Sequence, residues 1–136
     1  MSAKDFVTAL QHIGIPTNDI QKTVSFYESL GFSLRYQTVN ENTGEEVAFL
    51  GLQNITVETW QSGCAVGKTG AIDHIALEVT DIDRAYERLR AEGFHILDPM
   101  IQYLPYWNHG TRFFTIEGPN AEKIEFSQIL QEDFNV

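Results

Sequence analysis

Four side chains in this sequence have the types and the repeated spacing that a metal site needs: His12, Glu58, His74 and Glu125. Imidazole nitrogens and carboxylate oxygens suit a divalent ion such as Zn, Ni, Co or Mn, and water can complete the coordination. Two carboxylates held near each other are costly unless a cation neutralises them. The ligand set contains no thiolate, and the one cysteine, Cys64, is interpreted as a loop thiol.

The spacing of these four residues follows from an internal repeat. The segment HIGIPTNDIQKTVSFYESLGF at 12–32 aligns without a gap to HIALEVTDIDRAYERLRAEGF at 74–94, an offset of 62 residues. The two histidines are therefore equivalent, and the two glutamates are equivalent in the closing strand of each copy. Six residue pairs are identical: His12/His74, Ile13/Ile75, Asp19/Asp81, Ile20/Ile82, Gly31/Gly93 and Phe32/Phe94.

Each copy predicts a β-α-β-β-β module. An alternating apolar stretch predicts the opening strand, and Asp19 or Asp81 then precedes an amphipathic pattern that predicts a helix. Gly31 and Gly93 stand where a helix ends in a left-handed residue. The predicted strands cover 13–15, 33–40, 46–53 and 55–60 in the first copy and 75–79, 95–97, 111–117 and 123–128 in the second.

The predicted fold class is α+β. Neither module can cover its own sheet with one helix, so the modules are expected to pair. We expect a single domain over residues 1–136 with modules at 5–61 and 71–128. The two modules would pair into a curved sheet or cup, with the helices outside and a concave inner face.

Alternation along the strands predicts where the four ligands point. Val57 lies on the opposite face of its strand from Glu58. Ile124 and Phe126 likewise lie on the opposite face from Glu125. The same holds for each histidine and the apolar residues after it. An apolar face can thus meet the helix in every strand, which leaves two histidines and two glutamates on the inner face.

The connector over 98–110 is rich in aromatic and apolar residues for a loop, and connectors of this kind often form a substrate wall or lid. Tyr106 and Trp107 are therefore candidate substrate-binding residues, with a dimer contact or a local hydrophobic anchor as the alternative. Arg112 begins the next strand and could bind an anionic group of the substrate. A plain surface ion pair is the alternative for Arg112.

Net charge limits the classes of partner. The chain has 19 acidic and 9 basic residues, for a formal charge of −10. Such a surface repels phosphate backbones and anionic lipids, so we expect a small-molecule substrate and neither nucleic acid nor membrane as a partner. No apolar run approaches the roughly 20 residues of a membrane span, and the first residues lack a signal peptide, so a cytoplasmic location is expected.

These motifs resemble those of the vicinal oxygen chelate superfamily, which includes glyoxalase I, methylmalonyl-CoA epimerase, extradiol dioxygenases, and fosfomycin and bleomycin resistance proteins. The resemblance covers 6–128. It is carried by the two repeat openings and by TRFFTIEGPNAEKIEF at 111–126, which resembles the family's terminal signature. In that signature the ligand follows an isoleucine, a position that Glu125 holds here.

The order of ligands, His-Glu-His-Glu, is similar to that of glyoxalase I. The resemblance implies a divalent-metal-dependent lyase or isomerase that transfers a proton through a metal-bound enediolate. Glu125 is the first choice for the general base by analogy with glyoxalase I, and Glu58 is the second. An epimerase like methylmalonyl-CoA epimerase is one alternative, and a non-enzymatic drug-binding resistance protein is another.

Two positions depart from glyoxalase I of the short bacterial type. Pro16 and Ser62 stand where that family has an arginine and an asparagine that help to hold glutathione. A related substrate or a different thiol conjugate is therefore compatible with the resemblance. A homodimer is the expected assembly, and because both arrangements occur in the superfamily, the site can lie within one chain or across two.

Overall fold

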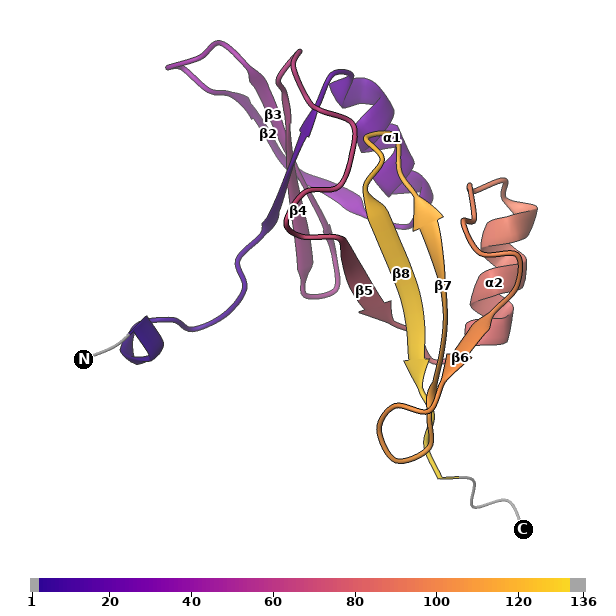
Figure 1. Cartoon of the computed structure of the whole chain (residues 1–136). Helices are drawn as coiled ribbons and strands as arrows, with labels where there is room; N and C mark the ends of the chain where they lie inside the picture. The colour runs from indigo at the N-terminus through magenta and orange to yellow at the C-terminus, as the bar shows by residue number, and fades with distance from the viewer. Residues whose placement is uncertain (1–2, 133–136) are drawn as a thin grey trace. The chain divides into compact units, whose positions relative to one another are not determined.

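The protein is described by a computed structural model over residues 3–132, and it divides into two compact units, Met1–Val66 and Gly67–Val136 (Figure 1). Each unit contains one β-α-β-β-β module with a four-stranded mixed sheet. The predicted α+β class and its two modules are therefore confirmed, whereas their pairing into one cup stays a prediction. No helix between residues 3 and 132 has the length and apolar character to span a membrane.

The first unit begins with a short 3-10 helix, η1 (Ala3–Asp5). Its module consists of β1 (Ile13–Thr17), α1 (Ile20–Ser29), β2 (Ser33–Val39), β3 (Glu46–Leu52) and β4 (Ile55–Gln61). The sheet order is β1-β4-β3-β2, with β1 parallel to β4 and the other pairs antiparallel. Helix α1 packs against β2, β3 and β4 and buries Tyr27 with Leu50 and Val57, all fully inaccessible to solvent.

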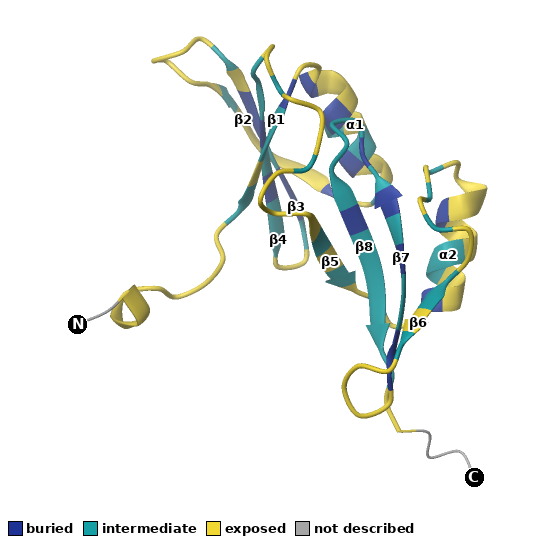
Figure 2. Ribbon diagram, in the orientation of Figure 1, coloured by how far each residue is buried: buried dark blue, intermediate teal, exposed yellow. Residues whose placement is uncertain are grey.

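The second unit repeats this connectivity. It contains β5 (His74–Glu78), α2 (Ile82–Ala91), β6 (Gln102–Leu104), β7 (Thr111–Glu117) and β8 (Lys123–Ile129), in the sheet order β5-β8-β7-β6. Helix α2 packs against β7 and β8, where Phe114, Ile116 and Ile124 are buried. Figure 2 shows the buried residues along the strands and on the sheet-facing side of each helix.

The two helices begin with the same chemistry. Asp19 and Asp81 are their N-caps, with φ near −148° and −149°, and each carboxylate accepts the backbone N–H three residues further on. A glutamine from the last strand of each module accepts the first helical N–H. Gln61 Oε1 lies 2.8 Å from the nitrogen of Ile20, and Gln128 Oε1 lies 2.9 Å from that of Ile82. These bonds satisfy donors that a helix leaves free at its start.

The helices also end alike. Gly31 and Gly93 have φ values of +106° and +86°, as the sequence predicted for residues just past a helix. The next residue in each unit, Phe32 or Phe94, donates its N–H back over the turn to a carbonyl five residues earlier. The glycine N–H also donates, to a carbonyl three residues earlier. These two bonds together require a left-handed residue, which explains why the glycine and the phenylalanine recur together.

One predicted strand is wrong. Residues 95–97 form only an isolated bridge between Ile96 and Ile116, because Asp98 takes over the next position on β7 with a hydrogen bond from the N–H of Thr115, 2.6 Å from its carboxylate. The strand that pairs with β7 at this edge of the sheet is instead β6, inside the segment 98–110 that was predicted to be a loop. Three residues are too few to show strand periodicity, so only the pairing with β7 defines it.

Candidate metal centre

His12 and Glu58 lie together in the first unit. His12 directly precedes β1. Gly14, two residues after His12, lies opposite Glu58 in the parallel pairing of β1 with β4. Residues two apart share a face of a sheet, so the imidazole and the carboxylate project on the same side. His12 Nε2 lies 3.3 Å from Glu58 Oε1. The flanking Val57 and Thr59 are buried on the opposite face, as alternation predicts.

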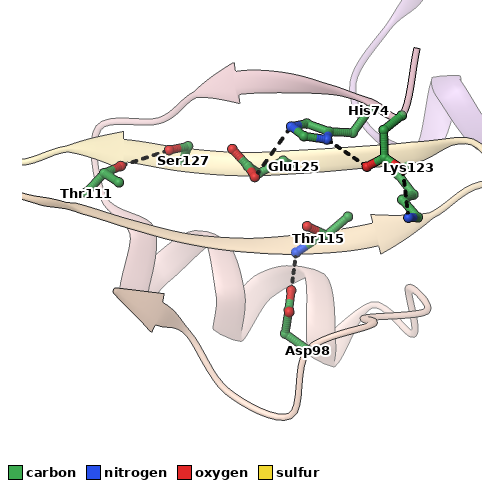
Figure 3. A network of polar contacts seen from close by, with 8 residues as sticks. His74, Asp98, Thr111, Thr115, Lys123, Glu125 and Ser127 are labelled. Carbon is green, nitrogen blue, oxygen red and sulfur yellow. Dashed lines mark hydrogen bonds and ion pairs between the residues drawn. The ribbon is translucent and has the colours of Figure 1, made fainter. Parts of the chain in front are cut away.

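His74 and Glu125 form the corresponding pair in the second unit (Figure 3). His74 opens β5, and Ala76 lies opposite Glu125 on β8, so the register is the same as in the first unit. His74 Nε2 lies 3.8 Å from Glu125 Oε1. Ile124 is buried on the opposite face. Each unit thus brings together one predicted histidine ligand and one predicted glutamate ligand through the same strand geometry.

The second ring nitrogen of each histidine also has a partner, supplied by the residue before it. Gln11 Oε1 lies 2.9 Å from His12 Nδ1, and Asp73 Oδ2 lies 3.0 Å from His74 Nδ1. Asp73 is held in turn by Lys123, whose Nζ lies 3.1 Å from its other oxygen. A hydrogen bond at the far nitrogen is how proteins orient histidine ligands of metals.

Charges and burial act differently on the two carboxylates of the second unit. The hydrogen bond from His74 lowers the pKa of Asp73 below its ordinary value, and Lys123 lowers it further. Burial raises the pKa of Glu125, with opposition from His74 and a smaller contribution in the raising direction from Asp98. Glu125 is therefore a carboxylate that is costly to leave charged without a nearby cation.

The donor set fits a divalent cation. The Asp73 carboxylate only accepts hydrogen bonds, so His74 Nδ1 carries a hydrogen and Nε2 of the neutral ring is left as a bare lone pair facing Glu125. Two electron-rich atoms that face each other are stabilised by a cation, either a proton or a metal ion. Within either unit, no three potential ligand side chains gather over the described residues. The binding of one ion by all four residues stays a prediction.

Aromatic side chains near the first pair were not predicted as part of the site. Phe49 lies opposite Glu58 on β3, and its ring packs edge-on against His12 with 5.8 Å between centroids. The Trp60 ring lies over Gly14, where an added Cβ would come within 3.2 Å of it. The surface around this pair is thus largely aromatic, a property that the sequence could show only once strand pairing was known.

An arginine lies on the same face, at a β-bulge. The pairing of β2 with β3 shifts between Leu34 and Tyr36, which inserts Arg35 as an extra residue. Its guanidinium lies over Gly51, in the space that a side chain there would fill, and donates to the carbonyl oxygen of Gln53 at 3.3 Å. Alternation from Leu34, which pairs with the buried Leu50, places Arg35 on this face, but its position over Gly51 depends on the strand register, which the sequence alone does not give.

The predicted substrate-binding residues of the second unit have mixed surroundings. Tyr106 and Trp107 are 57% and 72% exposed, and Trp107 lines an open hollow of about 340 Å³ together with Asn108, His109, Ile129, Leu130, Gln131 and Glu132. Arg112 makes two hydrogen bonds of 2.9 Å to Asp83 on α2, the ion pair considered as its alternative role. A role in substrate binding stays a prediction for all three residues.

Known proteins share this fold and sequence pattern. The chain is 35% identical over 124 residues to the uncharacterized protein YwbC of Bacillus subtilis, covering 88% of this chain and 96% of that one. It is 30% identical over 100 residues to the mitochondrial methylmalonyl-CoA epimerase of Dictyostelium discoideum, covering 66% of this chain and 60% of the epimerase. The chain therefore matches less than two thirds of the epimerase's length.

Among solved structures, the fosfomycin resistance protein FosX of Listeria monocytogenes, crystallised with Mn(II) and sulfate, superimposes with a TM-score of 0.69 at 16% identity. That match covers 92% of this chain and 95% of FosX, and it concerns the fold alone. The family model of the Glyoxalase/Bleomycin resistance protein/Dioxygenase superfamily matches residues 9–126, which include both His–Glu pairs. The chain belongs to this superfamily.

Proposed function

We propose that the chain is a divalent-metal-dependent lyase or isomerase that moves a proton at a carbon next to a carbonyl group, as the resemblance to glyoxalase I implies. The observation that carries this proposal is the orientation of the two histidines. Each ring is held through Nδ1 and directs Nε2 at a glutamate, at 3.3 Å in one unit and 3.8 Å in the other. Membership of a superfamily that contains many metal-dependent enzymes supports it.

His12, Glu58, His74 and Glu125 would hold the metal, which supplies Lewis acidity toward a carbonyl oxygen when bound. Glu125 is the first choice for the residue that takes the proton. It lies farther from its histidine than Glu58 does, so it is the more loosely held carboxylate. Burial also raises the pKa of Glu125, which makes its carboxylate a stronger base than an ordinary glutamate. Glu58 is the second choice.

An epimerase is the second candidate, favoured by the 30% identity to the methylmalonyl-CoA epimerase of Dictyostelium. Both candidate reactions begin with removal of a proton beside a carbonyl, so Glu125 would act as the general base in either one. They differ in the product, which is the mirror configuration at the same carbon for an epimerase and a constitutional isomer for a glyoxalase-type enzyme. Analysis of the products by chiral chromatography separates the two.

The test is proton exchange of 2-oxo compounds and thioesters in heavy water, followed by NMR with Mn(II)-, Ni(II)- or Zn(II)-loaded protein. We expect Glu125→Gln to lower the exchange rate by about 100-fold or more, since a positioned base contributes about that much. Glu78→Gln, on the edge strand β5, is the matched control and should retain the rate. Undiminished exchange in Glu125→Gln would overturn the assignment of the base.

A non-enzymatic drug-binding protein is the remaining alternative. Elemental analysis of the purified chain and titration with each divalent ion address this alternative directly. Stoichiometric binding supports the enzymatic proposal. If no divalent ion copurifies or binds, the proposal of a metal-dependent enzyme is contradicted and drug binding becomes the better explanation.

A further inference from the structure

The two His–Glu pairs have the same strand register but different groups behind the histidine. Gln11 and Asp73 occupy equivalent positions of the repeat, directly before His12 and His74. Both contact Nδ1, at 2.9 Å and 3.0 Å. One partner is a neutral amide and the other is a carboxylate. The contact to Nδ1 is therefore the same in both copies of the repeat, but the residue that makes it is neutral in the first copy and charged in the second.

This difference affects the proton on each ring. An amide can present either its oxygen or its NH₂ group to a ring nitrogen, so Gln11 permits both tautomers of His12. A carboxylate can only accept, so Asp73 requires the hydrogen of the neutral His74 ring to stay on Nδ1. The hydrogen bond to Asp73 is also assisted by charge and is stronger than a bond between neutral groups.

Lys123 makes the second difference. It lies opposite His74 in the pairing of β5 with β8, two residues before Glu125, and its Nζ lies 3.1 Å from Asp73 Oδ1 (Figure 3). The equivalent residue of the first unit is Thr56, which carries no charge. The carboxylate behind His74 is thus itself held in place from β8, the strand that carries Glu125.

We propose that Asp73, clamped by Lys123, is a positioning residue that fixes the ring and tautomer of His74 and makes it the stronger of the two histidine ligands. This inference rests on the proposed metal-dependent function. A carboxylate at Nδ1 increases electron density at Nε2, so His74 binds a cation more tightly than His12 does. His74 is then the tighter of the two histidine ligands and His12 the weaker.

Two isosteric substitutions test the charge at each position. Asp73→Asn gives the second unit the neutral partner of the first, and Gln11→Glu does the reverse. Zn(II) alone is titrated into the metal-free, full-length chain by calorimetry with a competing chelator. We expect Asp73→Asn to weaken binding about tenfold or more, and Gln11→Glu to tighten it. Lys123→Gln should weaken binding less than Asp73→Asn, because the bond to His74 remains.

A second readout needs no metal. In the metal-free protein, ¹⁵N NMR of the imidazole rings should show Nδ1 of His74 protonated in the wild type. Asp73→Ala should shift the neutral ring toward the Nε2-protonated tautomer, and the resonances of His12 should stay unchanged. Unfolding midpoints close to that of the wild type would show that these variants keep the fold, which separates positioning from a structural role.

The outcomes distinguish this inference from the proposed function. Unchanged Zn(II) affinity in both Asp73→Asn and Gln11→Glu, together with an unchanged His74 tautomer in Asp73→Ala, would overturn the positioning role. A wild-type chain that binds no metal would overturn the proposed function, and the tautomer measurement would then still decide whether Asp73 orients His74. A shift of the tautomer together with the expected order of affinities supports both.

Discussion

The ion pair between Arg112 and Asp83 ties β7 to α2 through two hydrogen bonds of 2.9 Å. Hydrogen bonding from Arg112 lowers the pKa of Asp83 below the ordinary value of an aspartate. The pair therefore stabilises the fold fully above the ordinary pKa of an aspartate, about 3.9, and this contribution is lost as the pH falls through the lower pKa of the folded state. Asp83 is 61% exposed, so the contribution is small, about 0.5 kcal/mol.

We expect Asp83→Asn to lower the free energy of unfolding by about 0.5 kcal/mol at pH 7. The difference from the wild type should shrink once the pH falls below the range in which Asp83 is charged. Urea unfolding at neutral and acidic pH measures it. A difference that is the same at every pH would show that the two residues interact by packing alone and that charge makes no contribution.

Gly51 is needed because the guanidinium of Arg35 takes the place of its side chain. We expect Gly51→Ala to displace Arg35 from the carbonyl of Gln53 at a cost of about 1 kcal/mol, a moderate value because the far end of a flexible side chain can move. In an Arg35→Ala background the same change should cost nothing or stabilise slightly, since alanine restricts the unfolded chain. Chemical unfolding of the four proteins of this cycle measures the coupling, and simple additivity would contradict it.

Residue types were enough to propose the four ligands, because histidine and glutamate recur at equivalent positions. The groups behind the histidines could not be predicted in this way. Gln11 and Asp73 are not identical, so the repeat alignment passes over them, and their role depends on ring orientation. Arg35 was missed for a related reason, since its position over Gly51 depends on the register of β2 against β3, which the bulge between Leu34 and Tyr36 changes.

At the level of elements, the last strand of each module serves both faces of its sheet. β4 presents Glu58 on one face and Gln61, three residues later, to the start of α1, and β8 does the same with Glu125 and Gln128. An odd spacing along a strand places two side chains on opposite faces. The strand that carries the candidate ligand therefore also fixes the helix behind it.

We expect Gln128→Leu to lower the free energy of unfolding by about 1–2 kcal/mol. The backbone N–H of Ile82 would lose its acceptor at 2.9 Å, and Ile82 is only 1% exposed, so water cannot readily replace it. Gln131→Leu, at an exposed position beyond β8, is the matched control and should change stability little. Equal stability of the two variants in urea unfolding would show that the hydrogen bond from the Ile82 N–H to Gln128 contributes nothing.

The helices were predictable almost to the residue because local chemistry defines their ends. Asp19 and Asp81 cap the starts, and Gly31 and Gly93 permit the left-handed residue that closes them. The strand β6 was not predictable, because only its pairing with β7 makes it a strand. Elements defined by local hydrogen bonds were thus predictable, whereas a strand defined only by long-range hydrogen bonds was not.

At the scale of the whole molecule, each unit offers two ligands, and two ligands are too few for tight binding of a divalent ion, which commonly uses three or four. We therefore expect one metal ion per chain and a requirement for both pairs. His12→Ala with Glu58→Ala should abolish stoichiometric Zn(II) binding, and so should His74→Ala with Glu125→Ala. Equilibrium dialysis with elemental analysis measures the stoichiometry, and near-wild-type affinity in either double variant would contradict a shared site.

Mixing the two double variants determines whether the chain binds metal alone or as the proposed homodimer. If a site combines the first unit of one chain with the second unit of its partner, each mixed dimer regains one intact site, about one quarter of the wild-type number overall. If each site lies within one chain, every mixed dimer stays without one. Unfolding and refolding the mixture allows subunits to exchange, and refolded wild type serves as the control. Restored Zn(II) binding would thus show that each site takes its two ligand pairs from different chains, because neither variant can supply all four ligands by itself.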